Sequence, residues 1–281
     1  GWKDISFDTL AAVSGASALF AYKPGTFMPK YANLFIGMDE RIAEATGFGW
    51  EGVPFEGVEE AWTVLKRGID AGRPLKGWHA ENVVFAGYRN AKTSPERQVF
   101  AMTDGPEYYA KWWTWDEFEQ WMADWSQNQL GRHTTLLIQA APRAIVLRVL
   151  RDLVDWAEAP PDAVKQRYPN AQFGLKGLEA YAEDCADMEA FDDWHACHGI
   201  NPQWTVRNST AVYLDDVAET KIFSEAVNVH LREAAAHYRD AYGAWRKFYE
   251  QLGHGAPEGA GTMKSRRLAG AAAVREALAY E

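Results

Sequence analysis

Cysteine is scarce in this sequence. The 281 residues include only two cysteines, Cys185 and Cys197, and both lie in the second half of the chain. A disulfide framework needs more cysteines in a shorter chain, and such frameworks belong to oxidising compartments. The scarcity therefore predicts a protein of the reducing cytoplasm.

Long apolar runs, an excess of basic charge and a P-loop motif are also missing. No run approaches the roughly 18 apolar residues of a transmembrane helix, and no signal-peptide pattern opens the chain. The 29 basic residues are outnumbered by 39 acidic ones, and the net charge of −10 argues against nucleic-acid binding. The P-loop motif G-x-x-x-x-G-K-[ST] does not occur, so nucleotide binding by that route is not expected.

Aromatic residues, in contrast, are abundant, with 13 tryptophans among them. The segment Trp115–Trp125 repeats large apolar residues at helical steps behind Thr114, which predicts an amphipathic helix with a threonine N-cap. Similar patterns predict further helices over Asp4–Tyr22, Asp39–Thr46, Val58–Ala71, Ala144–Ala157, Gly174–Asp193, Val212–Leu252 (whole or interrupted) and Lys264–Tyr280.

Strand patterns are confined to the first half of the chain. Leu75–Tyr88 and Gln98–Thr103 read as two adjacent strands joined by the polar loop RNAKTSPER, and TTLLIQAAP reads as another strand. Only helical patterns follow Arg143. We therefore predict the α+β class, with a mixed core and a small antiparallel sheet over residues 1–142. An all-helical domain over residues 143–281 is expected to pack on that core.

Polar residues gather where the predicted strands end. His79 and Glu81 are two apart and would share one face of a strand, and Asp104 directly follows the next strand. Two carboxylates beside a histidine can run acid–base chemistry or hold a divalent metal, and Trp78 and Asn82 flank them as candidate ligand contacts. The same residues are also compatible with ordinary hydrated strand ends.

Two motifs resemble a known family. The segments AGRPLKGWHAENVVFAGYRN and RQVFAMTDGPEYYAKWWTWDEFEQWM resemble the second half of the papain-like core of double-glycine leader peptidases and of the butirosin-type acyltransferase N-terminal domain. In that pattern a strand carrying a catalytic histidine ends in Gly-Tyr, here Gly87-Tyr88. The aspartate that orients the histidine follows a second strand, and Asp104 matches it. The segment ISFDTLAAVSGASALF resembles a helix that follows the nucleophile helix in such proteins.

The resemblance implies a papain-like fold over about residues 4–140, with acyl transfer or amide hydrolysis as the activity. This chain departs from the pattern at two points. Glu81 occupies the usual histidine position, with His79 two residues earlier, and no cysteine precedes residue 185. The nucleophile helix then belongs upstream of Gly1, or else Ser6 stands nearest the nucleophile position. A degenerate version that binds a small amide, amino-acid or acyl-type ligand fits these departures.

Two other functions stay open. Cys185, His195, Cys197 and His198 fall within one short segment and are zinc-ligand types, so this segment could hold a metal or a redox cofactor. No paired C-x-x-C is present, and buried cysteines with histidines near a helix end explain the segment equally well. Alternatively, the tryptophan-rich helices bind a partner protein or a second copy of this chain. No particular cofactor is indicated.

Overall fold

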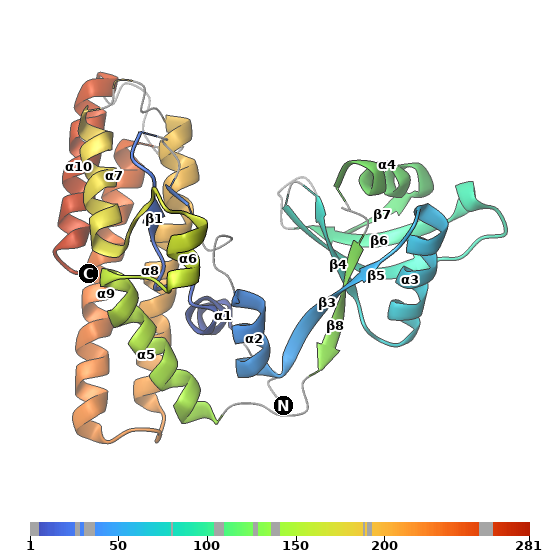
Figure 1. The fold of residues 1–281 in the computed structure, drawn as a ribbon, viewed down its shortest axis with the longest axis horizontal. Coiled ribbons are helices and arrows are strands. Elements are labelled where there is room, and N and C mark those ends of the chain that lie inside the picture. Colours follow the sequence, from blue (N-terminus) through green and yellow to red (C-terminus); the bar gives the residue numbers. More distant parts are fainter. Residues whose placement is uncertain are drawn as a thin grey trace. The chain divides into compact units, whose positions relative to one another are not determined.

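The computed structural model describes residues 6–25, 29–30, 37–79, 81–103, 110–125, 129–135, 141–187, 189, 193–252 and 261–281. At 29–30, 78–79, 81–82, 125, 129, 133–135, 167 and 193–202 only the backbone is described. The fold is mixed α+β, as the sequence predicts (Figure 1). The chain forms two compact units: residues 47–138, here the sheet unit, and residues 1–46 with 139–281, here the helical unit. This division differs from the expected one at residue 142, because the first 46 residues belong with the later helices.

The sheet unit is built on six antiparallel strands (Figure 1). Their order across the sheet is β3-β8-β4-β5-β6-β7. The strands are β3 (Phe48–Pro54), β4 (Leu75–His79), β5 (Glu81–Arg89), β6 (Gln98–Thr103), β7 (Lys111–Thr114) and β8 (Gln129–Thr135). Two helices, α3 (Val58–Asp70) and α4 (Trp115–Trp125), and the short 3₁₀ helix η2 (Ser94–Glu96) complete it.

Both long helices cover the same face of this sheet. Leu75 of β4 lies against Gly68 of α3, and Gly77, two residues on, lies under Trp121 of α4. Because residues two apart in a strand share a face, α3 and α4 pack on one side. The space between helices and sheet is filled mainly by aromatic and branched residues, including Trp62, Leu65, Leu75, Val83, Phe85, Val99, Trp113, Trp115, Phe118, Trp121 and Leu130.

The prediction of one strand over Leu75–Tyr88 is wrong. The segment is a hairpin in which β4 and β5 run antiparallel, and His79 pairs directly with Glu81. A single residue separates the two strands, and no Gly, Pro or Asn-Gly pair marks the reversal, so the sequence gives no turn signal there. The register between β5 and β6 shifts between Phe85 and Gly87, which is a β-bulge.

The helical unit contains most of the chain's helices. They are α1 (Phe7–Ser14), α2 (Met38–Thr46), α5 (Pro142–Glu158), α6 (Asp162–Arg167), α7 (Gly174–Asp187), α8 (Asp193–Glu219), α9 (Glu225–Gln251) and α10 (Met263–Leu278). A small sheet in the order β2-β1-β9 joins Pro29–Lys30, Ala21–Tyr22 and Gln172–Phe173. One hydrophobic cluster lies among α7, α9 and α10, and another among α1, α5, α8 and α9.

Helix boundaries differ from the predicted ones where glycine and proline were decisive. The predicted helix Asp4–Tyr22 ends at Ser14 because Gly15 adopts a left-handed conformation (φ +87°) and its N–H caps the helix. Helix α7 ends at Asp187 rather than Asp193. Helix α8 begins at Asp193 and runs through Pro202, whereas we expected no helix before Val212. The long segment is interrupted between α8 and α9, at residues 220–224.

Candidate functional site

The polar residues of the β4–β5 hairpin lie where these two strands end, at one end of the six-stranded sheet. His79 and Glu81 are paired across the hairpin, and Trp78 is paired with Asn82 one step further in. The backbone thus brings His79 close to Glu81, as expected, although the reason is cross-strand pairing rather than alternation within one strand. The side chains of all four residues lie outside the described part of the structure.

The neighbouring strand β6 ends at the same end of the sheet. Thr103, its last residue, pairs with Val83, two residues from Glu81 on β5. Asp104, which follows in sequence, lies outside the described residues. Strand pairing therefore brings the hairpin turn and the last residue of β6 to the same end of the strands, and that end of the sheet is the candidate site.

The glycine and tyrosine that follow Val83 and Val84 have local structural roles. A side chain at Gly87 would begin 3.2 Å from Cβ of Phe100, so glycine allows β5 and β6 to approach at the bulge. The Tyr88 hydroxyl donates a hydrogen bond to Oδ1 of Asp70 (2.7 Å), and its ring contacts Trp62 edge to face. Tyr88 therefore ties β5 to helix α3.

Ser6 belongs to the helical unit, whereas the hairpin belongs to the sheet unit. Its Oγ accepts a hydrogen bond from the Thr9 N–H (3.1 Å), which makes Ser6 the N-cap of α1. The sequence suggested Ser6 as the residue nearest the nucleophile position, and the structure gives its hydroxyl a capping role instead.

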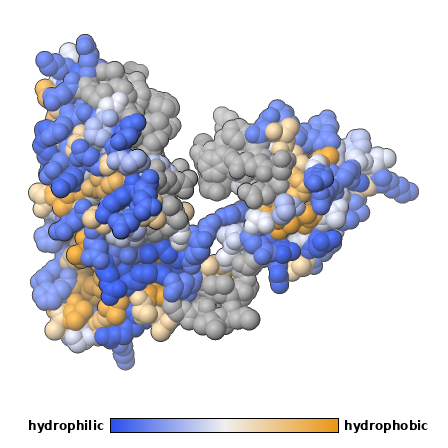
Figure 2. Space-filling view, in the orientation of Figure 1, coloured by the Kyte–Doolittle hydropathy of each residue, from blue (hydrophilic) through white to orange (hydrophobic). Residues whose placement is uncertain are grey.

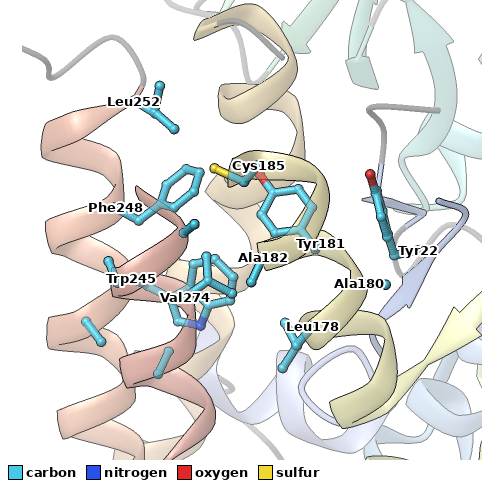
Figure 3. Packing of buried hydrophobic residues seen from close by; sticks show 14 of the residues in the cluster. Tyr22, Leu178, Ala180, Tyr181, Ala182, Cys185, Trp245, Phe248, Leu252 and Val274 are labelled. Atoms are coloured by element: carbon cyan, nitrogen blue, oxygen red, sulfur yellow. The ribbon is translucent and has the colours of Figure 1, made fainter. Parts of the chain in front are cut away.

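Cys185 is fully buried in the core of the helical unit. Figure 3 shows its sulfur beside Phe248 and Tyr181. The thiol lies 3.4 Å from the carbonyl oxygen of Arg267, and burial raises its pKa to about 12. Because metals and electrophiles react with the thiolate, this protonated and enclosed group is poorly suited to either role.

The remaining members of the proposed metal segment lie on another helix. His195, Cys197 and His198 are on α8, whereas Cys185 is on α7, and only the backbone of the α8 residues is described. Among the residues whose side chains are described, no group of three or more His, Cys, Asp or Glu is placed to hold a metal ion.

A buried charged cluster in the helical unit was not predicted. The Arg207 guanidinium donates to both carboxylate oxygens of Glu281, at 2.5 and 2.9 Å, and to Oε1 of Gln203 at 2.6 Å. Arg207, Glu281 and Tyr238 border a small hollow that also reaches Ser17. Burial, and then the charge of Glu281, raises the pKa of Tyr238. Arg207 and Glu281 are 74 residues apart, so no sequence spacing announces the pair.

The tryptophans that suggested a partner surface are mostly interior. In the sheet unit Trp62, Trp113, Trp115 and Trp121 are each no more than 4% exposed. Exposed large apolar side chains include Phe7, Leu147 and Val154, and Figure 2 shows a largely hydrophilic face with scattered apolar patches. These tryptophans therefore build the unit's own core.

The chain was also compared with known proteins. No family model matches it, and a search of curated proteins finds no match. In the part of the chain that the structure describes, no helix has both the length and the apolar character needed to cross a membrane.

Proposed function

We propose that the sheet unit is the second half of a papain-like core that binds a small amide, amino-acid or acyl-type ligand without covalent catalysis. The ligand would lie at the end of the sheet where the β4–β5 hairpin and the end of β6 meet. The observation that carries the proposal is the strand register, with His79 opposite Glu81 and Thr103 opposite Val83. The order of β5, bulge, β6 and aromatic helix agrees with the motifs that carry the resemblance.

Within residues 1–281, the cysteine positions favour binding over thiol catalysis at the hairpin. Both cysteines follow residue 184, and Cys185 is a buried free thiol. Histidine and carboxylate groups at the hairpin can donate and accept hydrogen bonds to an amide without a nucleophile. The free thiol also agrees with the reducing cytoplasm in which we place the protein.

The experiment uses N-acetyl-L-alanine p-nitroanilide, an amide whose hydrolysis releases a coloured amine. We expect saturable binding to the full chain by ligand-observed NMR, and no release of nitroaniline above the uncatalysed rate. Glu81→Gln and His79→Ala should each weaken binding about tenfold by removing one hydrogen-bond partner of the ligand. Glu96→Gln, an exposed carboxylate on η2 in the same unit, is the charge-matched control and should bind as the parent does.

Two results would refute the proposal. If Glu81→Gln and Glu96→Gln bind the anilide equally well, the ligand does not bind at the β4–β5 hairpin. Turnover that His79→Ala abolishes would show that the site is catalytic.

A further inference from the structure

Three arginines of the sheet unit line one open hollow on its surface. Arg67 comes from the last turns of α3, Arg73 from the segment after it, and Arg132 from β8. The remaining lining is apolar or small and consists of Val53, Val64, Gly68 and Ala71. The hollow thus combines several guanidinium groups with an uncharged wall.

The end of α3 brings two of these arginines together. Gly68 leaves room for the returning chain, since a side chain there would begin 2.4 Å from Cδ1 of Leu75. Gly72 adopts φ +70°, and the Arg73 N–H then donates to the Gly68 carbonyl (2.9 Å). This reversal, a common helix end, returns Arg73 to the last turn that carries Arg67.

The strands supply the opposite wall. Arg132 of β8 is paired with Leu75 of β4, whose side chain packs under α3, so Arg132 lies on the helix-covered face. On its other side Arg132 is paired with Glu51 of β3. Its Nε donates to Oε1 of Glu51 at 2.6 Å.

Charge in this hollow is not balanced within the described part of the chain. Glu51 is an ion-pair partner of Arg132, but the side chains of Arg67 and Arg73 have neither a hydrogen bond nor an ion pair with any described residue. Both side chains are exposed, so in a protein of net charge −10 they form a local positive patch that is open to an anionic ligand. Interaction with the negative end of the α3 dipole stabilises part of this positive charge, because both arginines lie near that end.

We propose that this hollow binds a small carboxylate with a short apolar tail. A guanidinium matches a carboxylate with two parallel hydrogen bonds, and the Arg67 and Arg73 side chains form no such bonds to the described residues. The tail would lie against Val53, Val64 and Ala71. The proposal is independent of the ligand at the hairpin, because the hollow adjoins the first residue of β4 and the hairpin turn follows its last.

The test is calorimetric titration of the full chain with hexanoate, and with hexanamide as its uncharged counterpart. Hexanoate should bind saturably and hexanamide at least about tenfold more weakly, the difference expected for charge-assisted hydrogen bonds. Arg73→Gln and Arg67→Gln should each weaken hexanoate binding by about the same factor. Lys92→Gln, which removes one exposed positive charge from the same unit, should bind hexanoate as the parent does.

Two further variants test whether a ligand binds in the hollow or the arginines only interact with the α3 dipole. Ala71→Trp fills the hollow without changing charge and should abolish binding. Glu51→Gln releases Arg132 from its ion pair and should tighten binding about threefold, the range of exposed ion-pair energies. Thermal unfolding of every variant checks that its fold is kept.

Several outcomes would overturn the proposal. One is hexanamide binding as tightly as hexanoate, and another is equal hexanoate binding by Arg73→Gln and Lys92→Gln. If Arg67→Gln and Arg73→Gln lower the thermal stability but leave hexanoate binding unchanged, the two arginines only stabilise the end of α3. Glu81→Gln should leave hexanoate binding unchanged, so this test and the test of the hairpin ligand can fail separately.

Discussion

Each unit contains an arginine–glutamate pair, and the two pairs differ in exposure. In the helical unit the side chains of Arg207 and Glu281 are 5% and 7% exposed. In the sheet unit those of Arg132 and Glu51 are 41% and 46% exposed. Burial makes a charge expensive to leave unpaired, whereas water compensates an exposed one. Arg207 and Glu281 therefore form a pair inside the fold of the helical unit, whereas the Arg132–Glu51 pair of the sheet unit remains accessible to solvent.

The largest effect is expected from breaking the buried pair. Arg207→Met should lower the free energy of unfolding by about 3–5 kcal/mol, because it leaves the Glu281 carboxylate buried without its partner. Urea denaturation followed by circular dichroism measures it. The double variant Arg207→Met/Glu281→Leu should recover most of the loss, since no charge then stays buried. A double variant as unstable as the single one would contradict this account.

A smaller loss is expected from overpacking the sheet unit. In Gly77→Ala the new methyl group would begin 2.4 Å from Cζ2 of Trp121, which should cost about 1–3 kcal/mol of unfolding free energy. Gly243→Ala is the control, because nothing lies within 4 Å of a side chain added there. It sits within α9 and should gain up to about 1 kcal/mol from helix propensity. Equal effects in both variants would refute the close packing of Trp121.

The helical unit should lose stability at alkaline pH. Burial raises the pKa of Cys185 and of Tyr213 to about 12 each, from ordinary values of 9.0 and 10.0. Each group stabilises the fold fully below its unfolded pKa, and that stabilisation is lost as pH rises toward the folded pKa.

Cys185→Ala tests the thiol's share of this loss. Between pH 8 and about pH 10 the parent should lose about 1 kcal/mol more of unfolding free energy than Cys185→Ala. Urea titrations at both pH values measure the difference. Identical slopes with pH for the two proteins would show that the thiol does not contribute.

The smallest effect is expected at the exposed pair. Arg132→Gln should change the unfolding free energy by less than about 1 kcal/mol, and 0.5 M salt should reduce the difference further. Chemical denaturation with and without salt measures it. A loss as large as that of Arg207→Met would abolish the contrast between the units.

Elements with strong periodicity and clear ends could be predicted from the sequence. The helix Trp115–Trp125 and the strand Gln98–Thr103 have the predicted bounds, and α3 differs by one residue at its end. In each, the buried residues recur at the period of the element, and a polar or small residue marks the boundary.

Other elements depended on contacts that the sequence does not display. β3 contains glycines and a proline and has mainly exposed side chains, so its strand character comes from pairing with β8 along its whole length. The β4–β5 hairpin has no turn signal. Pro202 stands inside α8 without ending it, and a local reading takes proline as a break.

The candidate site was only partly predictable for the same reason. The nearness of His79 and Glu81 followed from their spacing, because residues two apart are close in either arrangement. The arginine hollow joins residues 67, 73 and 132, and the last of these reaches it only through strand order. No local pattern contains that information.

Strands β3 and β8 are neighbours in the sheet, and Phe48 is the pairing partner of Thr135. The sheet unit therefore begins and ends on adjacent strands, and the first residue of β3 is directly paired with the last residue of β8. An insertion with such close ends requires little of its host, since a short linker can replace it. The 47–138 segment thus has the connectivity of a domain inserted into the helical unit, and a short linker in its place should leave the two flanking parts of the chain joined.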